Sequence, residues 1–101
     1  MGEKLVRDGI PAKCRAQGED EPFRLVAGEA EHDRLLDRKL DEELQEWRDD
    51  QEPIELADLL AVIRDTATRR GVSWPALLTM EADKRAAYGG FLGGVVWLGV
   101  P

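Results

Sequence analysis

Two pairs of acidic residues have the spacing that a metal site carried on helices requires. Glu43 and Glu46 lie three residues apart in the run Glu-Leu-Gln-Glu, and Glu55 and Asp58 lie three apart in Glu-Leu-Ala-Asp. Residues at this spacing share one helix face, with Cβ atoms about 5–6 Å apart, so each pair can converge on one ion. Mg²⁺ prefers carboxylate and water oxygens as ligands, and Mn²⁺ accepts the same donors. The pattern therefore indicates a divalent-cation site.

The angular position of Glu43 on its helix distinguishes it from an ordinary surface acid. At 100° per residue, Glu43 lies about 20° from Leu36, inside the apolar stripe, whereas Glu46 lies at the edge of the stripe, about 80° away. A carboxylate that points into a bundle is costly unless it is paired or binds a metal. Acids three apart are also common on solvated helix faces. The spacing alone leaves both interpretations open, and the angle of Glu43 favours a site.

The first acidic pair belongs to a long helix expected over residues 29–50. Its apolar residues recur at spacings of four, four and three and so form one stripe: Leu36, Leu40, Leu44 and Trp47. The segment has no Gly or Pro and is rich in good helix formers. The residue before a proline is disfavoured in helical conformation, so Pro53 ends this helix and can begin the next.

Two further helices are expected after Pro53. Residues 54–70 carry the second acidic pair and an apolar face, and Gly71 supplies the C-terminal end. The following helix runs to about residue 88, with Ser73 as its N-cap and Gly89 just beyond its end.

The remaining segments are short. A helix begins at Ile10-Pro11, with the proline at its first position, and closes near Gly18. Residues 23–26 and 95–98 are candidate short strands.

These elements predict a single all-α domain over residues 1–101, a bundle of three to four helices. Short connections favour antiparallel neighbours. In the hairpin of the two long helices, Glu46 and Asp58 lie at similar heights on facing helices. The two acidic pairs can therefore form one composite site.

The composition argues against several classes of protein. The 101 residues include 14 basic and 21 acidic side chains, a net charge of −7 that argues against a nucleic-acid partner. Cys14 is the only cysteine, so an internal disulfide and a thiolate zinc site are excluded. The N-terminus lacks an apolar signal region, and the apolar stretch from Phe91 is too short to span a bilayer. A cytoplasmic protein with no membrane partner is expected.

Four segments carry a resemblance to known proteins. They are residues 4–11 (KLVRDGIP), 39–46 (KLDEELQE), 55–60 (ELADLL) and 84–91 (KRAAYGGF). In this order they resemble the phosphoribosyl-ATP pyrophosphohydrolase-like proteins of the all-α NTP pyrophosphohydrolase superfamily, which includes MazG. Together the four segments are far more specific than any one of them.

The resemblance implies a Mg²⁺-dependent enzyme that hydrolyses a nucleoside triphosphate between its α and β phosphates. The products are a monophosphate and pyrophosphate, and clearance of non-standard nucleotides is the implied role. The family motifs imply four metal ligands, Glu43, Glu46, Glu55 and Asp58, with Glu43 and Glu46 also catalytic. Phosphate-binding candidates are Lys4, Arg7, Lys84 and Arg85. Because the chain carries a charge of −7, a bound cation is needed to attract a polyanionic substrate.

The chain also departs from this family pattern. Gly9 stands where relatives usually carry a basic residue, and only eight residues, 47–54, separate the acidic pairs. These departures keep open an alternative, a non-catalytic helical module that binds a partner or a nucleotide. The glycine-rich apolar tail after Phe91 is expected to pack across a subunit interface. A chain of this size has a thin core, so a homodimer or homotetramer is expected.

Overall fold

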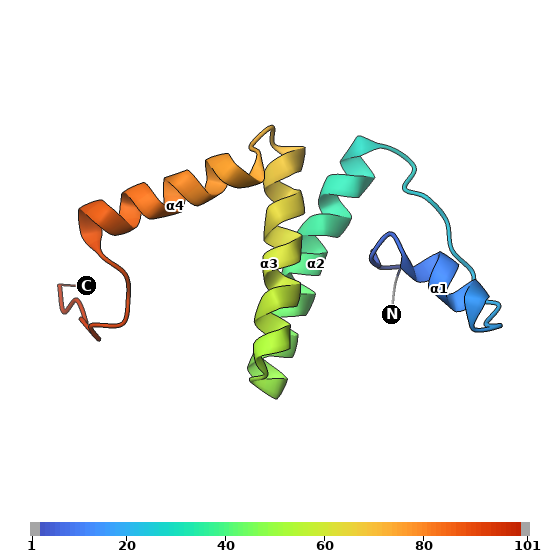
Figure 1. Ribbon diagram of the computed structural model, residues 1–101, viewed down its shortest axis with the longest axis horizontal. Helices are drawn as coiled ribbons and strands as arrows, with labels where there is room; N and C mark the ends of the chain where they lie inside the picture. Colours follow the sequence, from blue (N-terminus) through green and yellow to red (C-terminus); the bar gives the residue numbers. More distant parts are fainter. Residues whose placement is uncertain (1–2, 100–101) are drawn as a thin grey trace.

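The computed structural model describes residues 3–99, and all regular structure in that range is helical. The four helices are α1 (Ile10–Ala16), α2 (Glu29–Asp50), α3 (Pro53–Arg69) and α4 (Trp74–Tyr88) (Figure 1). The predicted all-α class is confirmed, and the three long helices begin and end within one residue of their expected bounds. In the described part of the chain, no helix has the length and apolarity needed to cross a membrane.

The prediction of two short strands from the sequence was wrong. Residues 23–26 lie in the irregular loop before α2, and residues 95–98 lie in the irregular tail after α4. A strand needs a neighbour to accept and donate its backbone hydrogen bonds. No segment within residues 3–99 pairs with either one.

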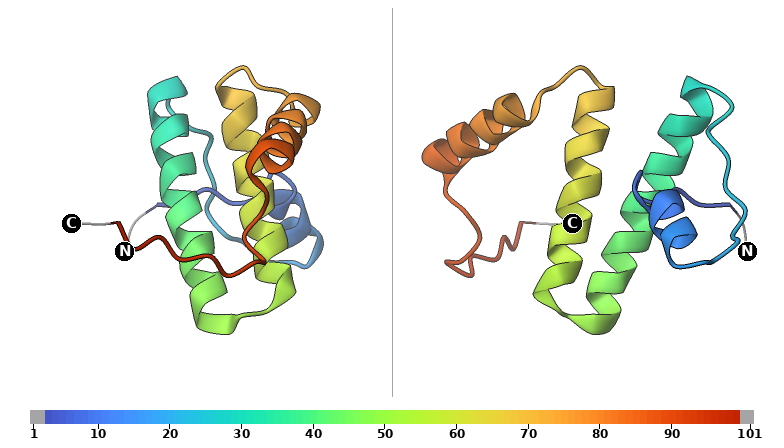
Figure 2. Two further views of the ribbon diagram at one scale, coloured as in Figure 1. Left: turned by 90° about the vertical axis from the view of Figure 1, so that its left-hand side faces the viewer. Right: turned by 45° about the vertical axis from the view of Figure 1, so that its right-hand side comes forward.

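Helices α2 and α3 form an antiparallel hairpin that contains the buried core (Figures 1 and 2). Its most buried apolar side chains are Leu35 and Leu36 on α2 and Val62 on α3. The connecting turn is tight because Gln51 adopts a left-handed conformation with φ of 55° and donates its N–H to the Trp47 carbonyl at 2.8 Å. Pro53 then occupies the first turn of α3, as predicted. This hairpin sets the register between the two acidic pairs.

The N-terminal segment and the loop before α2 are fastened to the hairpin by ion pairs. The Arg24 guanidinium contacts Glu3 at 2.9 Å and Glu31 of α2 at 2.8 Å. Glu31 also accepts a hydrogen bond of 2.8 Å from the Ala27 backbone N–H. Hydrogen bonds from Arg24 and Ala27 lower the pKa of the Glu31 carboxyl from its usual 4.5 to about 2.

Helix α4 leaves the end of α3 at a sharp angle and extends away from the hairpin (Figures 1 and 2). Ser73 caps it as predicted, with its hydroxyl accepting from the Ala76 N–H at 3.3 Å. The turn requires Gly71 at φ of 79°, a conformation that glycine adopts without strain. Arg64 of α3 stacks over the Trp74 ring, 5.3 Å from its centroid, and so joins the two helices at this corner.

Candidate metal centre

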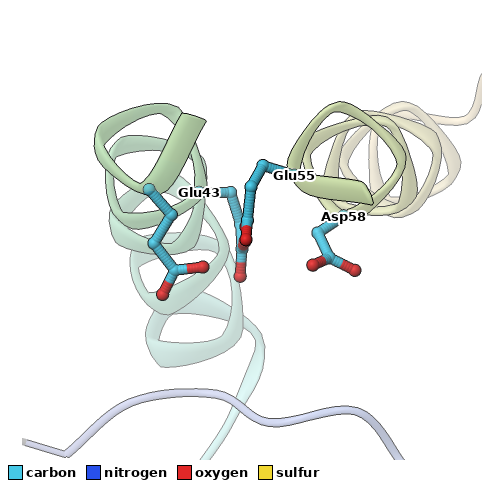
Figure 3. Close-up of side chains that lie close together, drawn as sticks. Glu43, Glu55 and Asp58 are labelled. Atoms are coloured by element: carbon cyan, nitrogen blue, oxygen red, sulfur yellow. The ribbon is translucent and has the colours of Figure 1, made fainter. Parts of the chain in front are cut away.

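The structure brings the four predicted carboxylates together between α2 and α3. One carboxylate oxygen from each of Glu43, Glu46, Glu55 and Asp58 lies within 4.8 Å of the others. Figure 3 shows Glu43, Glu55 and Asp58 directed toward the same side of the hairpin. Each pair shares one helix face because its residues are three apart, and the antiparallel turn brings the two faces together. We call these four residues the acidic cluster.

Glu43 is the most buried member of the acidic cluster, with only 7% of its surface exposed. The inward direction predicted from its helical angle is therefore observed. Among the described residues, two buried oxygens of the cluster have no hydrogen-bond partner, Glu43 Oε2 and Glu55 Oε2. An unsatisfied buried polar atom costs about 1–3 kcal/mol, and more when its group is charged. Such oxygens are available to a bound cation.

Burial and like charge both disfavour ionisation at the centre of the acidic cluster. Burial raises the pKa of Glu43, and the neighbouring Glu46 carboxylate raises it further, while Lys39 acts in the opposite direction. Burial also raises the pKa of Glu55, with the nearby Asp50 charge adding to the effect. A bound divalent cation would offset the cost of burial and the repulsion between carboxylates, because it favours the charged form of every carboxylate around it.

Three cations lie beside the acidic cluster. Lys39 Nζ is 3.3 Å from Glu43 Oε1, Arg7 Nη2 is 2.8 Å from Asp58 Oδ1, and Lys4 Nζ is 3.1 Å from Glu42 Oε1. Lys4 and Arg7 belong to the N-terminal segment, which passes the hairpin on the side toward which the carboxylates point (Figure 3). The structure thus places two of the four predicted phosphate-binding residues at the candidate site.

Lys84 and Arg85, the other two predicted phosphate-binding residues, lie away from the acidic cluster. Both lie in the second half of α4, which projects away from the hairpin (Figure 1). Arg85 instead pairs with Glu81 one turn earlier, at 2.9 Å.

Lys39 is a site residue that the sequence reasoning missed. It lies within the segment KLDEELQE, four residues before Glu43, and this spacing places the two side chains on one helix face. Lys39 also contacts Glu42 at 3.1 Å. Burial acts to raise the pKa of Glu42, but hydrogen bonds from Lys4 and Lys39 outweigh it and lower that pKa. The i, i+4 spacing was the signal that could have identified Lys39.

No family model, curated protein or solved structure matches this chain. The indications of function are therefore the residues of the acidic cluster, their geometry and the groove beside them.

An open groove of about 600 Å³ adjoins the acidic cluster. It lies between the N-terminal segment and the hairpin, and both Glu43 and Asp58 contribute to its wall. Charged groups line it together with apolar side chains such as Leu5, Leu36 and Val62. A groove of this size with mixed lining suits a small molecule that has a charged end and a less polar body.

The donor set fits a hard divalent cation. Four carboxylates on two rigid helices supply only oxygen ligands, which Mg²⁺ and Mn²⁺ prefer over nitrogen or sulfur. The orphaned Glu43 oxygen is a second observation that points to the same ligand, since nothing else in the described chain satisfies it. The nearby Arg7 and Lys4 are suited to anionic groups brought in by a metal-bound ligand.

Proposed function

We propose that this protein is a Mg²⁺-dependent nucleotide pyrophosphohydrolase that clears non-standard nucleotides. It would hydrolyse a nucleoside triphosphate between the α and β phosphates to a nucleoside monophosphate and pyrophosphate. The observation that carries the proposal is the buried Glu43 carboxylate, whose Oε2 has no partner among the described residues and which lies among three further carboxylates. Burying such a group is costly unless an ion compensates it.

The resemblance noted in the sequence supports the same proposal. The segments KLDEELQE and ELADLL contribute all four carboxylates of the acidic cluster. The segment KLVRDGIP contributes Lys4 and Arg7. Three of the four segments that carry the resemblance therefore meet at one place in the fold.

Glu43, Glu46, Glu55 and Asp58 would hold the cation in this proposal. When bound, Mg²⁺ neutralises phosphate charge and lowers the pKa of a water molecule in its shell. Arg7 and Lys4 would bind non-bridging phosphate oxygens, Arg7 by exchanging its Asp58 partner for phosphate. Glu43 or Glu46 would orient the attacking water and accept its proton. Water would add to the α phosphorus, the bond from that phosphorus to the oxygen that bridges to the β phosphate would break, and pyrophosphate would leave with that oxygen.

The groove supplies a place for the rest of the nucleotide. It adjoins the acidic cluster, and its apolar residues include Leu36 and Val62. A nucleoside presents this combination of a flat base, a sugar and a charged phosphate end. Holding the nucleoside beside the carboxylates would align the phosphates with the attacking water, which is the main contribution a protein makes to phosphate chemistry.

Pyrophosphate release from a panel of nucleoside triphosphates, standard and non-standard, tests the proposal. With Mg²⁺ present, at least one nucleotide should be hydrolysed, and Glu43→Gln and Asp58→Asn should each lower the rate by about 100-fold or more. Asp41→Asn is the matched control, because Asp41 is an exposed acid on the same helix outside the acidic cluster. It should retain full activity.

Two results would contradict the proposal. Turnover that survives in both Glu43→Gln and Asp58→Asn would remove the metal assignment. Metal binding by the wild-type chain, measured by Mn²⁺ titration, without turnover of any nucleotide would instead support the non-catalytic helical module.

A further inference from the structure

One row of side chains on α3 runs along the wall of the groove and begins at the acidic cluster. Its members, which all line the groove, are Asp58, Val62, Asp65 and Arg69. At 100° per residue the last three lie within about 40° of Asp58, and Asp65 lies within about 20° of it. Figure 3 shows Asp58 directed to the side on which the N-terminal segment passes, so the whole row faces that side. The groove therefore extends from the acidic cluster toward the open end of the hairpin.

A second row, on α2, runs beside the first. Glu43, Leu36 and His32 line the groove and lie within about 20° of one another around the helix axis. Leu36 and Asp65 are each seven residues from an acidic-cluster member on their own helix. Because the two helices are antiparallel, Leu36 and Asp65 lie at the same level, about 10 Å from the cluster. This distance is comparable to the reach of a nucleoside from its 5′ phosphate to the outer edge of its base.

The wall between the acidic cluster and this level is largely apolar. Leu36 and Val62 are buried members of the hairpin core that also form the floor of the groove. Leu5 and Ile10, before and at the start of α1, border the groove from the N-terminal side. A flat base held here would lie between apolar side chains, and only its edge would meet polar groups.

Asp65 is available to meet that edge. Other charged side chains of the groove have partners already: Lys39 pairs with Glu43, Arg7 with Asp58, and Arg69 with Asp33. Within residues 3–99 the Asp65 carboxylate makes no ion pair and no hydrogen bond, and it is exposed on the groove wall. An exposed acid is ordinary on a helix, but this one lies in line with a member of the acidic cluster, at the level that a base edge would reach.

The chemistry of a carboxylate restricts which base it can bind well. Its two oxygens accept two parallel hydrogen bonds and donate none. Guanine presents two adjacent donors on one edge, N1–H and the 2-amino group. Adenine and cytosine present one donor beside an acceptor, and uracil presents one donor between two acceptors, which a carboxylate would repel. A modification at C8 of the purine leaves both guanine donors in place, so selection of this edge is compatible with a non-standard nucleotide.

We propose that Asp65 is the residue that selects the base, and that the groove takes nucleoside triphosphates whose base has adjacent N1–H and 2-amino donors. The inference rests on the proposed function, because phosphates bound at the acidic cluster determine where the base lies. The Asp65 carboxylate accepts both hydrogen bonds, while the face of the base lies against Leu36 and Val62. Asp65 does not touch the reacting phosphates, so it determines specificity and not the chemical step.

Pyrophosphate release from GTP, ITP and XTP in Mg²⁺ tests this assignment. ITP lacks the 2-amino group, and XTP has a carbonyl oxygen in its place. The wild-type kcat/KM should be at least about 10-fold higher for GTP than for either analogue, because a hydrogen bond to a charged group has about this effect or more. Asp65→Asn should reverse the preference to XTP, since the amide accepts from N1–H and donates to the xanthine O2. Asp41→Asn, an exposed acid of α2 outside the groove, should keep the wild-type order.

The reversal distinguishes base recognition from a structural role of Asp65. A purely structural residue would change the rates for all three nucleotides by the same factor. Equal wild-type kcat/KM values for GTP, ITP and XTP would overturn the inference. The same order of nucleotides in wild type and Asp65→Asn would overturn it as well. Either result leaves the proposed hydrolysis intact.

Binding of GMP, IMP and XMP separates the inference from the proposed function, because it requires no turnover. Their dissociation constants in Mg²⁺, measured by isothermal titration calorimetry, should follow the same order and show the same reversal in Asp65→Asn. Preferential binding of GMP through Asp65 without hydrolysis of any triphosphate would contradict the proposed reaction and support the base selection. Hydrolysis with no base preference in either measurement would contradict the base selection alone.

Discussion

Glu43 carries an energetic cost that its neighbours offset only in part. Its Oε1 lies 3.3 Å from Lys39 Nζ, but its Oε2 has no partner within the described chain, and Glu46 adds a like charge nearby. A buried carboxylate in this setting destabilises the chain unless a cation is bound. Residues that cost stability in this way are characteristic of functional sites.

Glu43→Gln should therefore stabilise the protein in EDTA while removing its response to metal. We expect the free energy of unfolding in EDTA to rise by about 1 kcal/mol, because the neutral amide removes a buried charge and can donate to the remaining carboxylates. Addition of Mg²⁺ should raise the melting temperature of the wild-type chain and leave that of the variant nearly unchanged. Differential scanning calorimetry in both buffers measures the two effects. Equal Mg²⁺ responses in variant and wild type would contradict the assignment.

At the scale of elements, Arg24 and Glu31 determine how the loop before α2 attaches to the hairpin. Glu31 lies in the first turn of α2, where a negative charge is also favoured by the helix dipole. Its carboxylate accepts from the Arg24 side chain and from the Ala27 N–H. The position of the N-terminal segment, and with it Lys4 and Arg7, depends on this attachment because Arg24 also binds Glu3.

The Glu31 contacts predict a specific dependence of stability on pH. The pKa of Glu31 falls from 4.5 to about 2 on folding, so its contribution is complete above about pH 4.5 and is lost as the pH falls toward 2. The destabilisation caused by Glu31→Gln should therefore be largest near neutral pH and shrink between pH 4.5 and 2. Urea unfolding at several pH values measures it. The control is Glu21→Gln, which removes the same charge from the exposed loop. A destabilisation by Glu31→Gln that does not vary with pH would contradict this explanation.

The turn between α2 and α3 offers a second test at this scale. Gln51 is the one non-glycine residue in the described range with a positive φ, at 55°. Glycine is preferred at this position of a helix end because it has no Cβ to clash. Gln51→Gly should raise the free energy of unfolding by up to about 1 kcal/mol. Gln45→Gly, the same replacement inside α2, should lower it by about 1 kcal/mol. Thermal unfolding of both variants measures these changes. A loss of stability in Gln51→Gly would show that the contacts of the Gln51 side chain stabilise the turn by more than its backbone conformation costs.

For the whole molecule, the direction of α4 divides the predicted phosphate-binding residues into two groups. Arg7 lies 2.8 Å from Asp58 in the acidic cluster, whereas Lys84 and Arg85 lie on α4. Charges separated by more than a Debye length, about 8 Å at physiological ionic strength, are largely screened from one another.

Lys84→Gln combined with Arg85→Gln should therefore leave the affinity for Mn²⁺ within about twofold of the wild-type value. Arg7→Gln should increase that affinity about threefold or more, since it removes a positive charge in direct contact with a ligand. Titration of Mn²⁺ by electron paramagnetic resonance measures both. A tenfold loss of affinity in the double variant would show that Lys84 and Arg85 of α4 do act on the acidic cluster.

Local interactions explain why the helix bounds and the acidic cluster could be predicted from the sequence alone. Helix ends at Pro53, Ser73 and Gly89 depend on the conformational limits of those residues, which act within a few positions of the chain. The inward direction of Glu43 followed from the rotation of one helix, and the convergence of the acidic pairs followed from one tight turn.

Contacts between distant segments could not be obtained in that way. Residues 23–26 and 95–98 have extended-strand composition, but they form no strand because pairing requires a neighbouring segment, and none of the described residues 3–99 provides one. The contact of Arg7 with Asp58 and the separation of α4 from the hairpin depend on how whole elements are oriented. Periodicity and capping specify where a helix begins and ends and which of its faces is apolar. The side chains that meet across the molecule are selected by packing between elements, which no single segment encodes.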